Sequence, residues 1–271
     1  MKLSALLSIY HKENPKYFNQ AMESIWDKQT LKPDEIVLVK DGALTQELDK
    51  VIELWQEKLG KVLKVIALPK NIGTGGAKKV GVENCTGDYI AVVDTDDICT
   101  SERFAKQVDF LNKNTEIDAV GTWLSEINND GEIIKEVVKY PLTNDELFEF
   151  FKKRDAIAHA TTMFRNTFFE KSGNYRGELL LAEDTLLWYY GYLNNCKLAN
   201  IDYIGLHVRR DEGMYERRAD WNKSINLLKF RLLKINRDLN YGIMADIYAI
   251  AYFLMSVSPS FVKKIAYKIF R

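Results

Sequence analysis

The chain has 271 residues, and its 38 basic and 38 acidic side chains give a formal net charge of zero. A nucleic-acid-binding protein is usually basic, so this balance argues against that class. Hydrophobic residues make up 46% of the chain, which is enough for a buried core and excludes a mainly disordered protein. The length predicts one large domain, or one domain with an appendage.

The cysteines, the histidines and the apolar runs bear on the compartment of the protein, on a zinc site and on a membrane span. The cysteines are odd in number and widely spaced, which favours a reducing compartment over a disulfide framework: Cys85, Cys99 and Cys196. The histidines are too scattered to predict a zinc site: His11, His159 and His207. No uncharged apolar run reaches the roughly 18 residues of a membrane span. We interpret the apolar residues 3–9 as a buried strand rather than a signal peptide.

The first half of the chain alternates apolar runs with helical patterns. Strands are expected at residues 3–9, 35–39, 62–68 and 89–93. Helical spacing of apolar residues lies between them, and Asn14-Pro15 predicts an N-cap followed by the first helical position. Strands separated by helices in this way form βαβ units. The predicted fold class is therefore α/β, with a mostly parallel central sheet flanked by helices.

The second half predicts a different arrangement. The expected elements are a hairpin at residues 119–138, strands at 157–164 and 198–208, a helix at 183–193, and a helical region from about Trp221 to the end, broken at Pro259. Asp130-Gly131 supplies the hairpin turn. We therefore predict a main domain over residues 1–220 and a C-terminal helical extension over residues 221–271.

Polar residues follow three of the predicted strands, at Tyr10, at Asp41 and at residues 94–97. Ligands of parallel sheets bind beyond the carboxyl ends of the strands, so these loops are expected to meet at one site. Asp94, Asp96 and Asp97 would repel one another unless a cation neutralised them, and Mg²⁺ or Mn²⁺ prefers such oxygen ligands. The alternative is a solvated acidic loop or a helix cap, but the position after a buried strand favours the cation site.

The two loops near Asp41 have both functional and structural interpretations. Asp41 can accept a hydrogen bond from a base N–H, or can belong to an ordinary turn with Gly42. The glycine-rich residues 71–76, which include Gly73, can bring backbone close to a nucleotide, or can form a tight strand-to-helix turn. They match neither GxGxxG nor the P-loop ending.

Acidic and basic groups in the second half leave similar alternatives open. Glu183 and Asp184 can supply a general base, or can stabilise the start of a helix. His207 can be a hydrogen-bonded structural residue, and the pair Arg209-Arg210 can bind a diphosphate or lie on the solvated surface.

The ordered set of these motifs resembles family 2 glycosyltransferases, which are inverting enzymes of the Rossmann-like GT-A fold. The resemblance covers about residues 3–215 and rests on residues 6–10, 24–30, 35–42, 71–73, 87–97 and 183–184. Residues 103–107 and 214–218 are similar to the bacterial branch that makes O-antigen, capsule and exopolysaccharide. The resemblance implies that residues 1–220 form a GT-A catalytic domain.

The resemblance implies roles on the donor side. Asp41 would pair with the uracil of a UDP-sugar, beside Tyr10 and the Ser8 backbone, with Gly73 close to the nucleotide. Lys40 stands where the family often has an acid, and it could reach a phosphate instead.

The resemblance also implies the catalytic groups. Asp94 and Asp96 would form the DxD motif that holds the ribose and a Mn²⁺ or Mg²⁺ ion, and Asp97 could share the metal. Asp184 would be the general base, with Glu183 beside it on the acceptor side. His207 and Arg209 would contact the metal or the diphosphate from a closing loop.

The branch implies a substrate pair as well. We expect galactose transfer from UDP-galactose to a saccharide linked to undecaprenyl diphosphate, with UDP-GlcNAc, UDP-GalNAc or UDP-Glc as alternative donors and no nucleic-acid partner. A nucleotidyltransferase is less favoured, because residues 3–10 carry no basic glycine-rich signature. A non-catalytic carbohydrate-binding protein would be favoured by loss of Asp96 or Asp184, and both are present.

The sequence of the C-terminal extension, with its apolar segment and the basic residues after it, predicts a membrane contact. Residues 243–257 are apolar on nearly every face but too short to span a bilayer, and four cations follow: Lys263, Lys264, Lys268 and Arg271. Such a segment suits a helix lying on an anionic bilayer. The expected location is therefore cytoplasmic, at the inner face of the inner membrane. Packing on the main domain or in a homodimer interface is the alternative.

Overall fold

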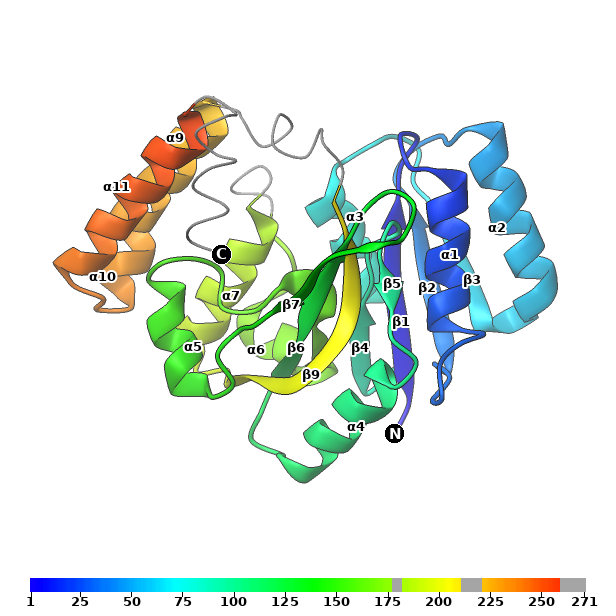
Figure 1. The fold of residues 1–271 in the computed structure, drawn as a ribbon, viewed down its shortest axis with the longest axis horizontal. Helices are drawn as coiled ribbons and strands as arrows, with labels where there is room; N and C mark the ends of the chain where they lie inside the picture. The colour runs from blue at the N-terminus through cyan, green and yellow to red at the C-terminus, as the bar shows by residue number, and fades with distance from the viewer. Residues whose placement is uncertain (177–181, 211–220, 259–271) are drawn as a thin grey trace.

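The computed structural model describes residues 1–176, 182–210 and 221–258. In these residues one mixed sheet lies between two layers of helices (Figure 1). The strands are β1 (Leu3–Ile9), β2 (Glu35–Lys40), β3 (Leu63–Ala67), β4 (Tyr89–Val92), β5 (Ile98–Cys99), β6 (Ala119–Ile127), β7 (Ile133–Val138), β8 (Met163–Arg165) and β9 (Leu198–Arg209). Their order is β3-β2-β1-β4-β8-β6-β9-β5, and β7 pairs with β6.

The first four strands pair in parallel, and the sequence prediction for this half is confirmed. Residues 36–39 of β2 and all of β4 are buried, because helices cover both faces of the sheet. The carboxyl ends of β1, β2 and β4 lie at one edge, where Tyr10, Asp41 and Asp94 follow them in the chain.

Beyond β4 the sheet is mixed. β8 runs antiparallel to β4 and β6, β6 runs parallel to β9, and β5 and β7 pair antiparallel with β9 and β6. The strand expected at residues 157–164 is wrong, because His159–Thr161 forms a 3₁₀ turn and only β8 follows it. In this turn Thr162 N–H donates to the carbonyl of His159 at 2.9 Å, so these groups are not used to pair with a strand.

Helices form one layer on each face of the sheet. α1 (Pro15–Ile25), α2 (Gln46–Leu59) and α4 (Arg103–Lys113) share one apolar cluster with the strands. On the other face lie α3 (Thr74–Asn84), α5 (Asn144–Phe151), α6 (Asn166–Ser172) and α7 (Glu183–Leu193). The sequence prediction omits α5 and α6. A capping box between Thr143 and Glu146 starts α5, and this signal is present in the sequence.

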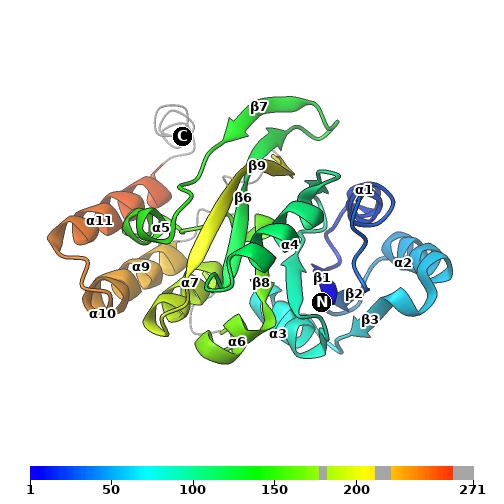
Figure 2. The same ribbon diagram turned by 90° about the horizontal axis from the view of Figure 1, so that it is seen from below.

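The C-terminal helices pack beside α5 and α7, far from α1 and α2 (Figure 2). They are α9 (Trp221–Phe230), a π-helical segment (Arg231–Ile235), α10 (Asn236–Asp238) and α11 (Ile243–Val257). Ile235 and Ala245 join the apolar cluster that contains Phe151 and Trp188. Part of the extension is therefore built into the same core as the sheet.

The helical region is interrupted earlier than expected. The chain turns at Gly242, where φ is +73°, whereas Pro259, the expected break, lies outside the described residues. No helix among the described residues has the length and apolar character needed to cross a bilayer. The proposed division at residue 220 also falls outside the described ranges and stays a prediction.

Candidate active site

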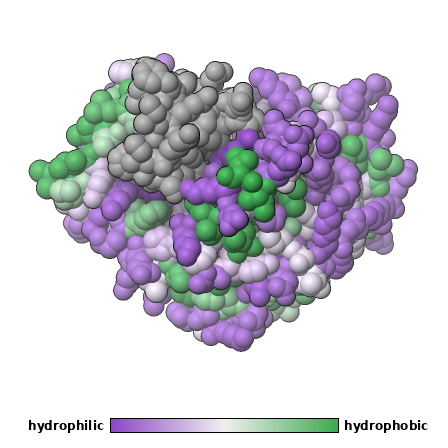
Figure 3. Space-filling model, viewed as in Figure 1, coloured by the Kyte–Doolittle hydropathy of each residue, from purple (hydrophilic) through white to green (hydrophobic). Residues whose placement is uncertain are grey.

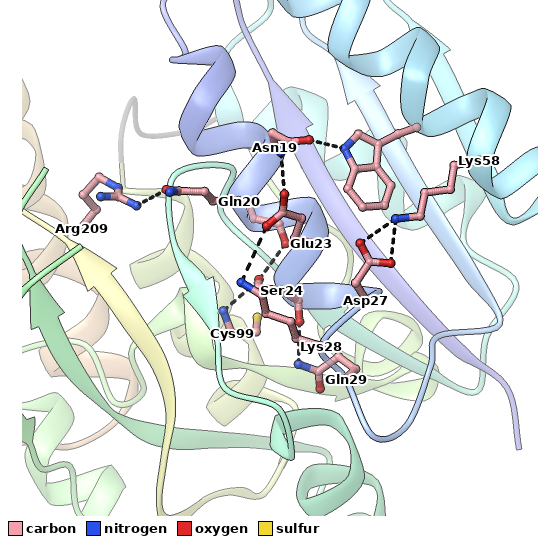
Figure 4. Close-up of polar contacts among 12 residues, drawn as sticks. Asn19, Gln20, Glu23, Ser24, Asp27, Lys28, Gln29, Lys58, Cys99 and Arg209 are labelled. Atoms are coloured by element: carbon pink, nitrogen blue, oxygen red, sulfur yellow. Dashed lines mark hydrogen bonds and ion pairs between the residues drawn. The ribbon is translucent and has the colours of Figure 1, made fainter. Parts of the chain in front are cut away.

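The carboxyl end of β4 leads into the acidic turn, residues 94–97, and β5 follows it. Asp97 is buried, and its Oδ1 accepts a hydrogen bond from the backbone N–H of Arg209 at 2.8 Å. The Arg209 guanidinium donates to the carbonyl of Asp96 at 3.0 Å and to the Gln20 side chain of α1 at 2.9 Å (Figure 4). Arg209 therefore positions the acidic turn, and its predicted contact with a diphosphate stays a prediction.

Negative charge accumulates at the acidic turn. Burial, with the carboxylates of Asp94 and Glu13, raises the pKa of Asp96 to about 7. Burial, with the carboxylates of Asp96 and Asp94, raises the pKa of Asp97 well above its usual range. A divalent cation would relieve this repulsion, so the oxygens of Asp94 and Asp96 fit the predicted Mn²⁺ or Mg²⁺. Within the described ranges no three His, Cys, Asp or Glu side chains are grouped so that they could hold an ion together.

A buried lysine joins the acidic turn to the predicted base. Lys78 of α3 is 4% exposed, and its Nζ lies 3.2 Å from Asp94 Oδ1 and 3.3 Å from His159 Nδ1. The same Nδ1 lies 3.4 Å from Asp184 Oδ1. Burial opposes the charge of Lys78, but Asp94, Asp184 and Glu183 hold its pKa above the usual value. Lys78 was not predicted as a site residue.

Glu183 and Asp184 begin α7, as expected, and lie against the start of α3. A Cβ added at Gly75 would lie 3.1 Å from Cβ of Glu183, so a larger residue there would push the two elements slightly apart. Burial, with the charge of Asp184, raises the pKa of Glu183. The charge of each acid therefore affects the ionisation of the other. Both acids also lie close enough to Lys78 to raise its pKa.

On the donor side, Asp41 holds the glycine-rich loop. Its Oδ1 accepts from Ile72 N–H at 2.7 Å and its Oδ2 from Gly73 N–H at 3.0 Å. Gly42 has φ +86°, and a Cβ there would lie 2.8 Å from the backbone nitrogen of Asn71. The structure thus brings Asp41 and Gly73 together. Lys40 forms an ion pair with Asp49 of α2, and its contact with a phosphate stays a prediction.

The remaining predicted residues lie on the neighbouring strands. Ser8 is half-buried in β1, and Tyr10 follows it with 39% exposure. His207 of β9 pairs with Ile98 of β5, directly after the acidic turn, and its Nδ1 lies 2.5 Å from Ser125 Oγ. Burial lowers the pKa of His207. Arg217 and Arg218, part of the resemblance, lie outside the described residues.

The start of α3 connects the three predicted parts of the site. Gly73 contacts Asp41, Gly75 contacts Glu183, and Lys78 contacts Asp94. The glycine-rich loop, the acidic turn and Glu183, which precedes the predicted base, therefore lie around the first turns of one helix. Backbone N–H groups at such an end favour anionic ligands.

Comparison with known proteins identifies the family. Glycosyl transferase family 2 matches residues 4–172. The chain belongs to this family. It is 34% identical over 219 residues to the amylovoran biosynthesis glycosyltransferase AmsE of Erwinia amylovora, covering 81% of this chain and 80% of the relative. It is 31% identical over 229 residues to an Escherichia coli UDP-Gal:alpha-D-GlcNAc-diphosphoundecaprenol beta-1,3-galactosyltransferase, covering 84% of this chain and 81% of the relative.

A solved structure supports the fold. A mannosyltransferase from Pyrobaculum calidifontis, determined in complex with GDP-Man and Mn²⁺, superposes with a TM-score of 0.66 at 14% identity, covering 94% of this chain and 72% of the other. The predictions of a GT-A α/β fold and of a glycosyltransferase enzyme are confirmed.

Proposed function

We propose that this glycosyltransferase moves galactose from UDP-galactose to a hydroxyl of a saccharide linked to undecaprenyl diphosphate, in bacterial surface polysaccharide synthesis. The observation that carries the proposal is the meeting of Asp41, Asp94 and Glu183-Asp184 around the start of α3. The names of the Erwinia and Escherichia relatives support the pathway, the donor and the lipid-linked acceptor. UDP-GlcNAc, UDP-GalNAc and UDP-Glc are the alternative donors.

Each part of the site has one task in the proposed reaction. Asp41 and the loop at Gly73 receive the uracil, beside Tyr10 and Ser8. Asp94 and Asp96 would hold Mn²⁺ or Mg²⁺, which would supply positive charge to neutralise the departing UDP. Asp184 takes the proton of the acceptor hydroxyl. The acceptor oxygen then attacks the anomeric carbon from the side opposite UDP. The bond between that carbon and UDP breaks, UDP leaves with the electron pair, and the configuration at the carbon inverts.

The proposed donor is tested by measuring UDP release from the four UDP-sugars with Mn²⁺ or Mg²⁺ and a short acceptor carrying GlcNAc or GalNAc on a diphosphate-linked alkyl chain. Acceptor-dependent release should be fastest with UDP-galactose. Faster release from another donor would replace galactose and keep the reaction. No sugar transfer from any donor, together with pyrophosphate formation from a sugar phosphate and a nucleoside triphosphate, would support a nucleotidyltransferase instead.

We also propose that α11 places the enzyme on an anionic bilayer at the cytoplasmic face of the membrane. Ala245, Ala249 and Phe253 face the core, whereas the outer face is apolar and exposed: Ile243, Met244, Ile247, Ile250 and Leu254. This face forms part of the hydrophobic area at the upper left of Figure 3. The cationic residues from Lys263 to Arg271 follow in the sequence and complement anionic lipid. A lipid-linked acceptor would be reached there.

Replacing Ile247 and Ile250 together by Glu should weaken binding to phosphatidylglycerol-containing vesicles about tenfold or more, because a buried apolar side chain contributes about 1.5–3 kcal/mol. Co-sedimentation measures this. Leu54→Glu is the control, since Leu54 is 64% exposed on α2, on the far side of the molecule. Turnover of a water-soluble acceptor should not change. Unchanged vesicle binding would contradict the proposal, and loss of a dimer in light scattering would assign this face to a second copy.

A further inference from the structure

The turn that carries the predicted base lies at the start of α7, where the side chain before the helix cannot cap it. The N-cap residue is Ala182, whose methyl group accepts no hydrogen bond from the helix. Glu183, Asp184 and Thr185 are the first three helical residues. The side chain of Thr185 is buried, and its Oγ1 donates a hydrogen bond to Asp155 Oδ1 at 2.6 Å. This bond fixes the turn to the segment that follows α5.

Asp155 is held in turn by an arginine of the C-terminal extension. Among the described side chains of α9 none is buried, whereas Arg231, the next residue in the chain, is 5% exposed. One guanidinium nitrogen, Nη1, donates to the carbonyl of Phe151, the last residue of α5, at 3.0 Å. The other, Nη2, lies 3.7 Å from Asp155 Oδ1. Arg231 also begins the π-helical segment, a rare form that is frequent at functional sites.

The charge of Arg231 is the feature that needs a reason. Burying a guanidinium costs free energy unless charged or polar groups pair with it, and an apolar side chain at this position would avoid that cost. The pairing with Asp155 is what the charge provides, because it balances the carboxylate whose Oδ1 accepts from Thr185. Two consecutive contacts therefore join the C-terminal extension to the residue next to Asp184.

We propose that Arg231, Asp155 and Thr185 act in series as positioning residues for sugar transfer, so that the C-terminal extension fixes where Asp184 lies against the acceptor hydroxyl. The proposal rests on the assignment of Asp184 as the base. Proton transfer needs the base within hydrogen-bond reach of the hydroxyl, and a displacement of about 1 Å can cost about 100-fold in rate. The extension then has a role in transfer that is separate from any contact with a bilayer.

A matched set of variants tests this series. Thr185→Val keeps the shape of the side chain but loses the donor, whereas Thr185→Ser keeps the donor. Arg231→Met removes the charge, and Arg231→Lys keeps it. Tyr189→Phe is the control, because the hydroxyl of Tyr189 binds Asp238 of α10 and so joins the same extension to α7 one turn beyond Thr185.

Transfer is measured with the UDP-sugar and the short diphosphate-linked acceptor that give the fastest UDP release. Thr185→Val and Arg231→Met should lower kcat about 10–100-fold, because the base is displaced, with KM for the donor within about threefold of the wild type. Thr185→Ser and Arg231→Lys should recover most of the loss, and Tyr189→Phe should keep the wild-type kcat. Thermal unfolding should show similar losses of stability in Thr185→Val and Tyr189→Phe, since each loses one buried hydrogen bond.

Combining Thr185→Val with Asp184→Asn separates positioning from structure. If Thr185 acts through the Asp184 carboxylate, its replacement should cost much of kcat in the wild type and little more in Asp184→Asn. An equal loss in both backgrounds would overturn the positioning role and leave the proposed function intact. So would a wild-type kcat in Thr185→Val or Arg231→Met beside a strongly impaired Asp184→Asn. A fully active Asp184→Asn would overturn the assigned base and the positioning role together.

Discussion

Replacing Asp184 by Asn should lower kcat about 10²–10⁴-fold, which is the usual contribution of a general base. The amide has almost the same shape as the carboxylate but cannot take a proton from the acceptor hydroxyl. Asp184 lies in the first turn of α7, and its side chain is 39% exposed, so an acceptor can reach it. Binding of the UDP-sugar, measured by calorimetry, should be kept, because the donor-side residues are unchanged.

Glu183→Gln is the matched control for this prediction. Glu183 precedes Asp184 in the same helical turn, and burial raises its pKa, so it too has a base-like environment. We expect Glu183→Gln to lose much less activity, since the contact with His159 belongs to Asp184. An inactive Glu183→Gln beside an active Asp184→Asn would reverse the two roles. Both variants should unfold near the wild-type temperature, which excludes a shared folding defect.

The parallel half of the fold could be predicted from the sequence because its signals are local. Strands buried on both faces appear as continuous apolar runs, as in β2 and β4. The start of α1 was equally clear: Asn14 accepts a hydrogen bond from Lys16 N–H at 2.9 Å, and Pro15 takes the first helical position. Neither feature depends on distant residues.

The mixed half was harder because its pairing joins distant segments. β6 runs parallel to β9 with Ala119 opposite Leu198, and no short window of sequence indicates that partner. The residues before β8 contain apolar side chains that resemble a strand, but the turn at His159 follows from burial of its ring among α3, α7 and Tyr175. Tertiary contacts therefore override the local pattern there.

In the candidate site too, some residues have a local sequence signal and others are brought together only by the fold. The carboxylates of the acidic turn stand out in the sequence because like charges rarely cluster after a buried strand. The cation that balances them does not: Lys78 is 16 residues from Asp94 and 81 from His159, and only the folded chain brings them together. The predicted contact of Arg209 with a ligand stays a prediction. Its hydrogen bonds to the backbone carbonyls of Asp96, Asn128 and Asn129 are a second feature that appears only in the folded chain.

Replacing Asp96 by Ala should lower transfer about 10³-fold or more. A metal ion contributes several kcal/mol of charge stabilisation in such reactions, and each 1.4 kcal/mol corresponds to about a tenfold change in rate. The fold should be retained, because the side chain of Asp96 lies among the like charges of Asp94 and Glu13. Without a divalent cation the variant should unfold at the wild-type temperature or above it, since one repelling charge is gone.

Metal binding itself provides the second measurement. Mn²⁺ should raise the unfolding temperature of the wild type, because a ligand that binds only the folded state stabilises it. The shift should be lost in Asp96→Ala and kept in Asp109→Ala, which removes an exposed carboxylate on α4. Addition of UDP should enlarge the wild-type shift, since diphosphate oxygens would add ligands to those that Asp94 and Asp96 would supply. An Asp96→Ala variant that transfers sugar in the presence of a chelator would show that the acidic turn does not act through a metal.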